Sequence, residues 1–400
     1  MRDEAAEPHA VGHCGATPLG PRRVAVLFPA LLGGGGAEYV CAWILQALAG
    51  VHDVTLVTLT PVDLGDLDRS YGTTIGNGAI SLRPTLPRVT GPLFERCFGR
   101  YSRLTTGLRQ HLLIRGFKAI RHEYDICFSA YNEMDFGTAG IQYLHDRPRS
   151  RAGGTLLKLL SGYDERRVLE NVSLAPSYWL KHRYDSAYPG LSSTVVYPPV
   201  RTLSPGKPWA EREDAFVCVA RLSAEKNVHE AISIVAGVRS RGFDVCLRIV
   251  SGGGRWPYDS RIRRLVRKNA DWITLHTDLS DGQYRAILRA GKFGVSACPA
   301  EGFGIATAEL IDAGRIPFVR KGAGGQAEIV HLNDSITFES VSEAVAKVVR
   351  ILHRPTAQCG IVAELADRKS RFSTDRFISD IRRLVDDLAA VTVRHGDEAS

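Results

Sequence analysis

Apolar runs alternate with amphipathic stretches along this chain, and the alternation predicts an α/β protein. Residues 23–31 form an apolar run that ends at a set of glycines, residues 37–49 have helical periodicity, and residues 53–59 are apolar again. The order strand, glycine loop, helix, strand is typical of the start of a doubly wound parallel sheet. Further strands are predicted at residues 126–129, 139–144, 171–175 and 194–197. Residues 60–92 have a weak pattern that predicts loops.

A polar stretch with four prolines, residues 198–208, is the best candidate for a linker. Beyond it the pattern predicts strands at residues 215–221, 245–251, 273–277, 293–297, 316–320 and 335–338. Helices are predicted between them, among others at residues 228–240, 281–290 and 305–313. We therefore expect two Rossmann-like domains that face each other across a cleft. The expected division is a disordered tail (1–20), a first domain (21–200), a linker (201–208), a second domain (209–372), and a closing helix and tail (373–400).

The composition of the chain excludes some classes of protein and favours others. Hydrophobic residues make up 44% of the chain and charged residues 24%, which excludes wholesale disorder. The longest apolar run, residues 24–32, is much shorter than the ~20 residues of a membrane-spanning helix. Eight scattered cysteines without a C-x-x-C pair favour a reducing cytoplasm. The net charge of +8 favours an anionic partner without choosing among nucleotide, lipid headgroup and nucleic acid.

The clearest candidate chemistry lies in residues 301–309, EGFGIATAE. The segment follows a predicted buried strand and opens a predicted helix, and ligands of such sheets bind at the carboxyl edge. Its glycines let backbone N–H groups approach an anion at the helix N-terminus. Because Glu301 and Glu309 would repel a phosphate, they are expected to accept hydrogen bonds from hydroxyls. A ligand that has both phosphate groups and sugar hydroxyls is a nucleotide sugar. The structural alternative is that Glu301 caps the helix and Glu309 lies on a solvated face.

The spacing of Glu301 and Glu309 around Gly-Phe-Gly resembles the signature of glycosyltransferase family 4, whose members are retaining enzymes of GT-B fold. Three more segments match the family in order: residues 34–38 (GGGAE), 221–227 (RLSAEKN) and 324–330 (GGQAEIV). Within the family, the chain is most similar to dolichol-linked α-1,2-mannosyltransferases, through its four-glycine loop and residues 195–199 (VVYPP), 251–255 (SGGGR) and 371–373 (RFS). Ala37-Glu38 replaces the Glu-Arg typical there, and no N-terminal membrane helix is evident. The resemblance therefore does not identify the acceptor of this protein.

The resemblance implies that the first domain lies on the acceptor side, that the second domain binds the nucleotide sugar, and that particular residues have the following roles. Arg221 and Lys226 would bind the donor diphosphate, and two surface cations in a loop are the alternative. Glu301 would bind hydroxyls of the transferred sugar, and Glu309 those of the ribose. His145, in YLHDRP, would donate to a sugar hydroxyl or position the acceptor, unless it is a histidine packed at a turn. Backbone groups near the distal phosphate, the sugar and the reaction centre would come from Gly302, Phe303, Gly304, Ile305 and Ala306, and from Gly35 and Gly36.

We thus expect a hexosyltransferase that moves a sugar, with mannose suggested by the resemblance, from a nucleoside diphosphate to a hydroxyl of a glycan, glycolipid or small molecule. Neither a cofactor nor a metal is expected to be required. Charge stabilisation of the departing diphosphate and orientation would carry catalysis. Three alternatives remain: a nucleotide-sugar epimerase, a dinucleotide-dependent oxidoreductase, and a module that binds donor without turnover. The second is disfavoured because residues 33–38 do not spell G-x-G-x-x-G.

Two other features are weaker candidates. Asp66-Leu67-Asp68 has the spacing of a metal-binding D-x-D motif, but we expect it in a loop without a preceding strand. Residues 94–121 carry seven Lys/Arg and one acid, with leucines near helical spacing. This segment is expected either to contact an anionic membrane or to be a solvated helical face. Exposed aromatic residues are not expected to be interleaved with its cations, so nucleic acid is not an expected partner. The predicted location is cytoplasmic, with peripheral contact at the inner face of the membrane.

Overall fold

The computed structural model describes residues 20–31, 35–87, 91, 94, 103–146, 154–203, 206–322 and 324–397. Residues 1–19 of the tail predicted at 1–20, Gly33 and Gly34 of the first glycine loop, and Pro205 of the predicted linker lie outside the described residues. Within the described part, no helix is long and apolar enough to cross a membrane.

The first domain is built on a parallel sheet, and its strand order over the described residues is β3-β2-β1-β4-β5-β6-β7. The strands are β1 (Arg23–Leu27), β2 (Asp53–Thr58), β3 (Ile80–Pro84), β4 (Ile126–Ser129), β5 (Ile141–Tyr143), β6 (Val172–Ala175) and β7 (Ser193–Val195). The helices are α1 (Gly36–Leu48), α2 (Leu64–Tyr71), α4 (Arg103–Ile120), α5 (Thr155–Ser161), α6 (Glu165–Leu169) and α7 (Tyr178–Ala187). The central strand β1 is buried on both faces, which explains why it reads as a continuous apolar run.

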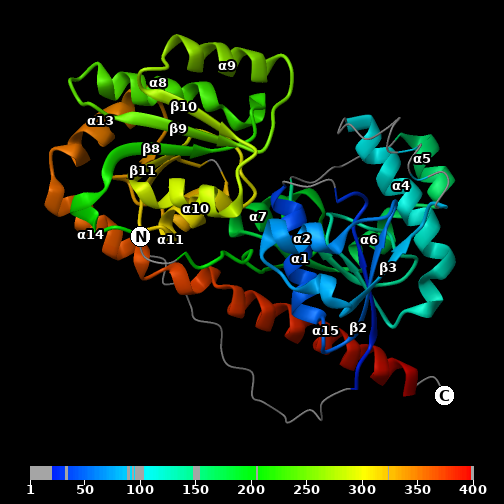
Figure 1. The fold of residues 1–400 in the computed structure, drawn as a ribbon. Helices are drawn as coiled ribbons and strands as arrows, with labels where there is room; N and C mark the ends of the chain where they lie inside the picture. The colour runs from blue at the N-terminus through cyan, green and yellow to red at the C-terminus, as the bar shows by residue number, and fades with distance from the viewer. Residues whose placement is uncertain are drawn as a thin grey trace.

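The second domain contains another parallel sheet, with the order β10-β9-β8-β11-β12-β13 over the described residues. Its strands are β8 (Glu213–Val219), β9 (Cys246–Ser251), β10 (Ile273–Thr277), β11 (Gly291–Ser296), β12 (Ile316–Arg320) and β13 (Thr337–Phe338). Its helices are α8 (Val228–Arg239), α9 (Tyr258–Lys268), α10 (Asp281–Ala290), α11 (Ile305–Asp312), α12 (Gly325–Ile329), α13 (Val341–Leu352) and α14 (Pro355–Ala366). The two domains lie side by side (Figure 1).

The last helix, α15 (Thr374–Asp397), leaves the second domain and runs along the first (Figure 1). Its apolar side chains Phe377, Ile381 and Val385 belong to the first domain's core. Arg382 Nε donates to the carbonyl of Ala47 in α1 at 2.6 Å. The chain therefore passes between the domains twice, and the first-domain core is completed by residues from the other end of the sequence.

The prediction of loops over residues 60–92 is wrong, because this segment contains α2 and β3. Local hydrogen bonds, rather than an apolar pattern, define α2: the Asp63 carboxylate accepts from the backbone N–H of Gly65 at 2.8 Å, and Gly72 ends the helix with φ of 70°. The Asp66-Leu67-Asp68 sequence lies within α2, not in a loop. Asp68 accepts hydrogen bonds from Thr73 and from the backbone of residues 75 and 76, so its carboxylate organises the turn after the helix.

The basic segment at residues 94–121 is described from residue 103 onward, apart from residue 94. Its helix α4 buries Leu113, Ile114 and Phe117 completely, and these side chains pack in a core cluster with residues of β1. The apolar stripe of α4 that includes Phe117 therefore packs against the first domain's sheet. This packing accounts for Phe117, whereas contact of the basic segment with an anionic membrane stays a prediction.

Candidate active site

The candidate site lies where the carboxyl ends of the second-domain strands face the first domain. The segment after β11 runs through Glu301 into α11, which begins at Ile305, as the sequence predicts. Gly304 precedes the helix with φ of 104°, a conformation that L side chains rarely adopt. The first N–H groups of α11 have no partner within the helix by geometry, so this turn can bind an anion.

Lys226 and Glu301 contact each other directly. The Lys226 Nζ donates to Glu301 Oε2 at 2.6 Å, although 75 residues separate them. The lysine side chain is 19% exposed and the glutamate side chain 25%. Burial lowers the pKa of Lys226, but the Glu301 carboxylate outweighs this effect, and the pKa ends above its ordinary value. The structure therefore holds an ammonium ion next to a carboxylate at the sheet edge, with some access for solvent.

Arg221 comes soon after β8, at the same edge of the sheet, and its side chain is exposed. The short helical turn at Ala224–Lys226 and the left-handed Asn227, with φ of 54°, turn the chain into α8. Asn227 Nδ2 donates to the carbonyl of Ala297 at 3.4 Å, which ties this turn to the segment after β11. The binding of a diphosphate by Arg221 and Lys226 stays a prediction.

Glu309 lies deeper than Glu301. The residue is only 8% exposed, so the alternative of a solvated face is wrong. Its Oε2 accepts a hydrogen bond from the Tyr284 hydroxyl at 2.5 Å, and burial raises the pKa of the carboxyl group. Arg201 lies close enough to counteract part of this rise. Arg201 also pairs with Asp281 at 3.1 Å. Sequence reasoning missed Tyr284, because no motif surrounds it.

His145 follows β5, and its ring nitrogen Nε2 lies 2.8 Å from the carbonyl oxygen of Ala130. Because a carbonyl only accepts, Nε2 carries the proton in neutral imidazole, and Nδ1 is an acceptor. Burial lowers the pKa of His145 to about 4. The Nε2 proton is thus already donated to Ala130, so the predicted donation from His145 to a sugar hydroxyl is not supported, and its role beside a donor or acceptor stays a prediction. Asn132, which sequence reasoning missed, positions this loop by accepting from the His145 backbone N–H at 2.7 Å.

The first glycine loop reaches the second domain. Gly35 precedes α1, and its N–H donates to the Glu38 carboxylate at 3.2 Å. The Tyr71 hydroxyl donates to the same oxygen at 3.0 Å. A Cβ added at Gly36 would lie 3.3 Å from Cδ1 of Ile305 at the start of α11. The start of α1 and the start of α11 are therefore neighbours, and a side chain at Gly36 would crowd the space between them.

The two domains also meet at Gly302 and Phe303. A Cβ added at Gly302 would lie 2.6 Å from the carbonyl oxygen of His145, so this glycine is needed for a close approach of backbone. Phe303 as a whole is 4% exposed and its ring packs against Tyr197 and Phe372, so its side chain is not available to a ligand. The structure thus brings His145, the Gly302 backbone and Glu301 to one place. Ala306 lies in the first turn of α11, and its contact with a ligand stays a prediction.

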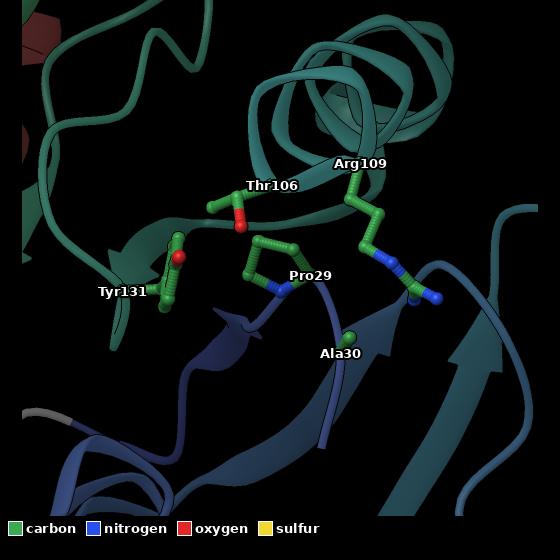
Figure 2. A pocket seen from close by; sticks show the side chains of 5 residues that line it. All are labelled: Pro29, Ala30, Thr106, Arg109 and Tyr131. Atoms are coloured by element: carbon green, nitrogen blue, oxygen red, sulfur yellow. The ribbon is translucent and has the colours of Figure 1, made fainter. Parts of the chain in front are cut away.

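A separate small hollow lies in the first domain near the carboxyl end of β1. It is lined by Pro29, Ala30, Thr106, Arg109 and Tyr131 (Figure 2). Figure 2 shows the Arg109 side chain extending from α4 toward the segment after β1. None of the predicted site residues lines this hollow, so the hollow gives no information on donor binding. Over the described residues, no group of three or more His, Cys, Asp or Glu side chains lies together as a metal site.

Most of the second domain matches a known family model. Residues 200–366 match the family model described as glycosyl transferases group 1. A curated relative, the GDP-Man:Man(3)GlcNAc(2)-PP-Dol alpha-1,2-mannosyltransferase of Dictyostelium discoideum, is 25% identical over 205 residues. That match covers 47% of this chain and 40% of the relative, so the chain matches less than half of the relative's length.

Solved structures match nearly the whole chain. HepE of Anabaena, solved with UDP and glucose, has a TM-score of 0.66 at 14% identity, over 91% of this chain and 99% of that one. Sucrose-phosphate synthase of Thermosynechococcus elongatus has a TM-score of 0.68 at 15% identity, over 92% of this chain and 100% of that one. These likenesses, with the two parallel sheets, confirm the predicted GT-B fold.

Proposed function

We propose, from the glycosyl transferases group 1 region at residues 200–366 within a GT-B fold, that this protein is a glycosyltransferase. It would transfer a sugar from a nucleoside diphosphate to an acceptor hydroxyl held on the first-domain side. The observation that carries the proposal is the contact between Lys226 and Glu301 beside the start of α11. An ammonium ion, a helix N-terminus and a carboxylate suit the two phosphates and the sugar hydroxyls of such a donor.

The pairing of Lys226 with Glu301 suggests how the donor would bind. A diphosphate would attract the Lys226 ammonium group, and the Glu301 carboxylate would then accept hydrogen bonds from hydroxyls of the transferred sugar. As the bond to the anomeric carbon breaks, negative charge grows on the leaving diphosphate, and Lys226 with Arg221 would stabilise it. Neutral His145 would orient one sugar hydroxyl through Nδ1. These residues require no metal in the proposed chemistry, and retention at the anomeric carbon with membership of family 4 belongs to the same proposal.

The donor is the first feature to test. The Dictyostelium relative is named for GDP-mannose, and HepE was solved with UDP and glucose, so GDP-mannose and UDP-glucose are the first two candidates. A donor that binds the native state raises the melting temperature. We expect a rise with one of them, and loss of the rise in Lys226→Ala. Lys268→Ala, an exposed lysine on α9, is the control. No rise with any nucleoside diphosphate or its sugar would contradict the proposal.

Turnover tests the reaction itself. With a hydroxyl acceptor present, NMR of the product would show a new glycosidic bond whose anomeric configuration matches that of the donor. Conversion of the donor to an epimer without acceptor would instead identify an epimerase, and a change in nicotinamide absorbance an oxidoreductase. If the protein binds the donor but transfers no sugar to any acceptor tested, it is a donor-binding module and not an enzyme.

A glycolipid acceptor would bring the protein to a membrane surface, and α5 is a second candidate contact beside the basic segment at residues 94–121. Leu156, Leu159 and Leu160 on α5 are 67%, 78% and 52% exposed, and Lys158 lies among them. Exposed leucines next to a cation suit the interface of an anionic membrane. Flotation with vesicles of anionic lipid tests this: we expect binding that Leu159→Ser weakens. Equal flotation of the variant, or none by the parent, would remove α5 as the contact.

A further inference from the structure

The carboxylate of Glu328 joins the two domains directly. Glu328 lies in α12 of the second domain, within the segment 324–330 that resembles a family motif, and no role for it follows from the donor chemistry above. Its Oε2 accepts from the backbone N–H of Tyr178 at 3.0 Å, and its Oε1 accepts from that of Trp179. Both N–H groups belong to the first turn of α7 in the first domain. A glutamate 150 residues away thus binds the N-terminus of this helix.

Charge and burial make this contact a strong one. The first N–H groups of a helix have no partner within it and carry partial positive charge, so a carboxylate there is favoured twice. The Glu328 residue is half-buried, and burial raises the pKa of its carboxyl group while the two backbone N–H groups oppose that rise. His182 lies nearby and also opposes the rise in the pKa of Glu328. Hydrogen bonds to an ionised acceptor are about twice as strong as neutral ones.

Ser177 extends the contact to the donor loop. It precedes α7, its Oγ accepts from the Leu180 N–H at 3.1 Å, and the same hydroxyl donates to the carbonyl of Gly302 at 2.6 Å. Ser177 itself is fully buried. We define the interdomain contact as Glu328 and Gly302 of the second domain with Ser177, Tyr178 and Trp179 of the first.

The interdomain contact bears on the site because the same loop faces His145. The space at Gly302 is filled on the first-domain side by the His145 carbonyl, which an added Cβ would meet at 2.6 Å. Glu301, one residue earlier, holds Lys226. Movement of α7 relative to α12 would therefore change the separation between His145 and the loop that carries Glu301.

The chain connects the two domains at two places, and these connections alone do not fix the orientation of one domain relative to the other. They lie together, since Val200 N donates to the Phe372 carbonyl at 2.7 Å and Val200 pairs with Ser373 as a short parallel bridge. Two neighbouring connections act as a hinge, about which the domains can rotate. A further polar contact removes part of that freedom.

We propose that Glu328 is a positioning residue that holds the two domains in the orientation that places His145 against the donor loop. It acts through the N-terminus of α7 and touches neither donor nor acceptor. The consequence for transfer rests on the proposed function, whereas the consequence for domain orientation does not. Loss of the carboxylate would let the cleft open while the diphosphate site in the second domain stays intact.

The test compares Glu328→Ala with Glu339→Ala, an exposed glutamate of the same domain, as the matched control. Small-angle X-ray scattering of the full chain measures domain orientation without any assay of transfer. We expect a larger radius of gyration for Glu328→Ala than for the parent and the control. Glu328→Gln keeps one acceptor oxygen and should fall between them. An unchanged radius of gyration in Glu328→Ala would overturn the proposal.

Kinetics and binding separate positioning from simple capping of α7. Glu328→Ala should lower kcat by about tenfold or more, while the dissociation constant of the nucleoside diphosphate changes by less than about threefold. If the residue only stabilises α7, the melting temperature falls and kcat at low temperature stays at the parental value, which would contradict the proposal. If the parent transfers no sugar to any acceptor, the proposed function fails, and the scattering experiment still decides the role of Glu328.

Discussion

The hydrogen bond between Tyr284 and Glu309 allows a quantitative test of the site. In Tyr284→Phe the ring remains and only the hydroxyl is lost, which leaves a buried carboxylate without a donor 2.5 Å away. A hydrogen bond to a charged group contributes about 1.5–3 kcal/mol. For a domain of this size, each kcal/mol shifts the melting temperature by roughly 2–4 °C, so we expect a decrease of about 3–12 °C at neutral pH.

The pH dependence has a definite sign. The pKa of Glu309 in the folded protein lies above its ordinary value, so the folded state binds this proton at a higher pH than the unfolded state does. Stability from this group is therefore present at acid pH and is lost as the pH rises through the folded pKa. The Tyr284 hydroxyl lowers that pKa, and its removal raises it further. Tyr284→Phe should consequently cost more at pH 7.5 than at pH 5.

Thermal unfolding of a double-mutant cycle provides the measurement. Tyr284→Phe is compared in the parent and in Glu309→Gln, where the acceptor no longer carries charge. We expect the tyrosine substitution to cost clearly less in the second background. If Tyr284→Phe shifts the melting temperature by less than about 1 °C, or costs the same in both backgrounds, the buried charged hydrogen bond inferred here is wrong.

Three further results are expected. Lys226→Ala and Glu301→Ala should each reduce turnover by roughly 100-fold or more in a single-turnover assay with unchanged circular dichroism, and near-parental turnover in both would refute the donor site. The pKa of His145, lowered to about 4, means that its contribution to stability is present above pH 6.5 and is lost as the pH falls toward 4. His145→Gln should therefore flatten the acid side of a stability profile, by roughly 3 kcal/mol at most, and equal slopes would contradict the lowered pKa. Gly302→Ala should widen the cleft, because the new Cβ would lie 2.6 Å from the His145 carbonyl oxygen; a scattering curve identical to the parent's would show that the loop accommodates it.

Local pattern predicted most of the second domain. The strands expected at residues 273–277 and 316–320 are β10 and β12, and the helix expected at residues 281–290 is α10. Strands in a sheet covered on both faces are nearly continuous apolar runs, and the helices between them show their own period. The pattern failed at α2 and β3, because a capped short helix and a half-exposed edge strand need few apolar residues.

The candidate site was predicted in its components but not in its contacts. Motif spacing identified Lys226, Glu301, Glu309 and His145 and placed them after strands. It did not predict that Lys226 pairs with Glu301, or that the Tyr284 hydroxyl donates a hydrogen bond to Glu309. Tyr284 lies in an ordinary helical pattern, and it belongs to the site only because its hydroxyl meets Glu309, 25 residues further along the chain.

The sequence by itself determined the α/β architecture, the glycine turns and the polar residues at strand ends, because these follow from the periodicity and chemistry of neighbouring residues. Only the tertiary structure decided which of those groups meet. Glu328 and the first turn of α7 are separated by about 150 residues, and α15 completes the core of a domain that begins at the opposite end of the chain. Contacts of this kind depend on how two sheets and a long helix pack in space, and no local pattern along the chain records that packing.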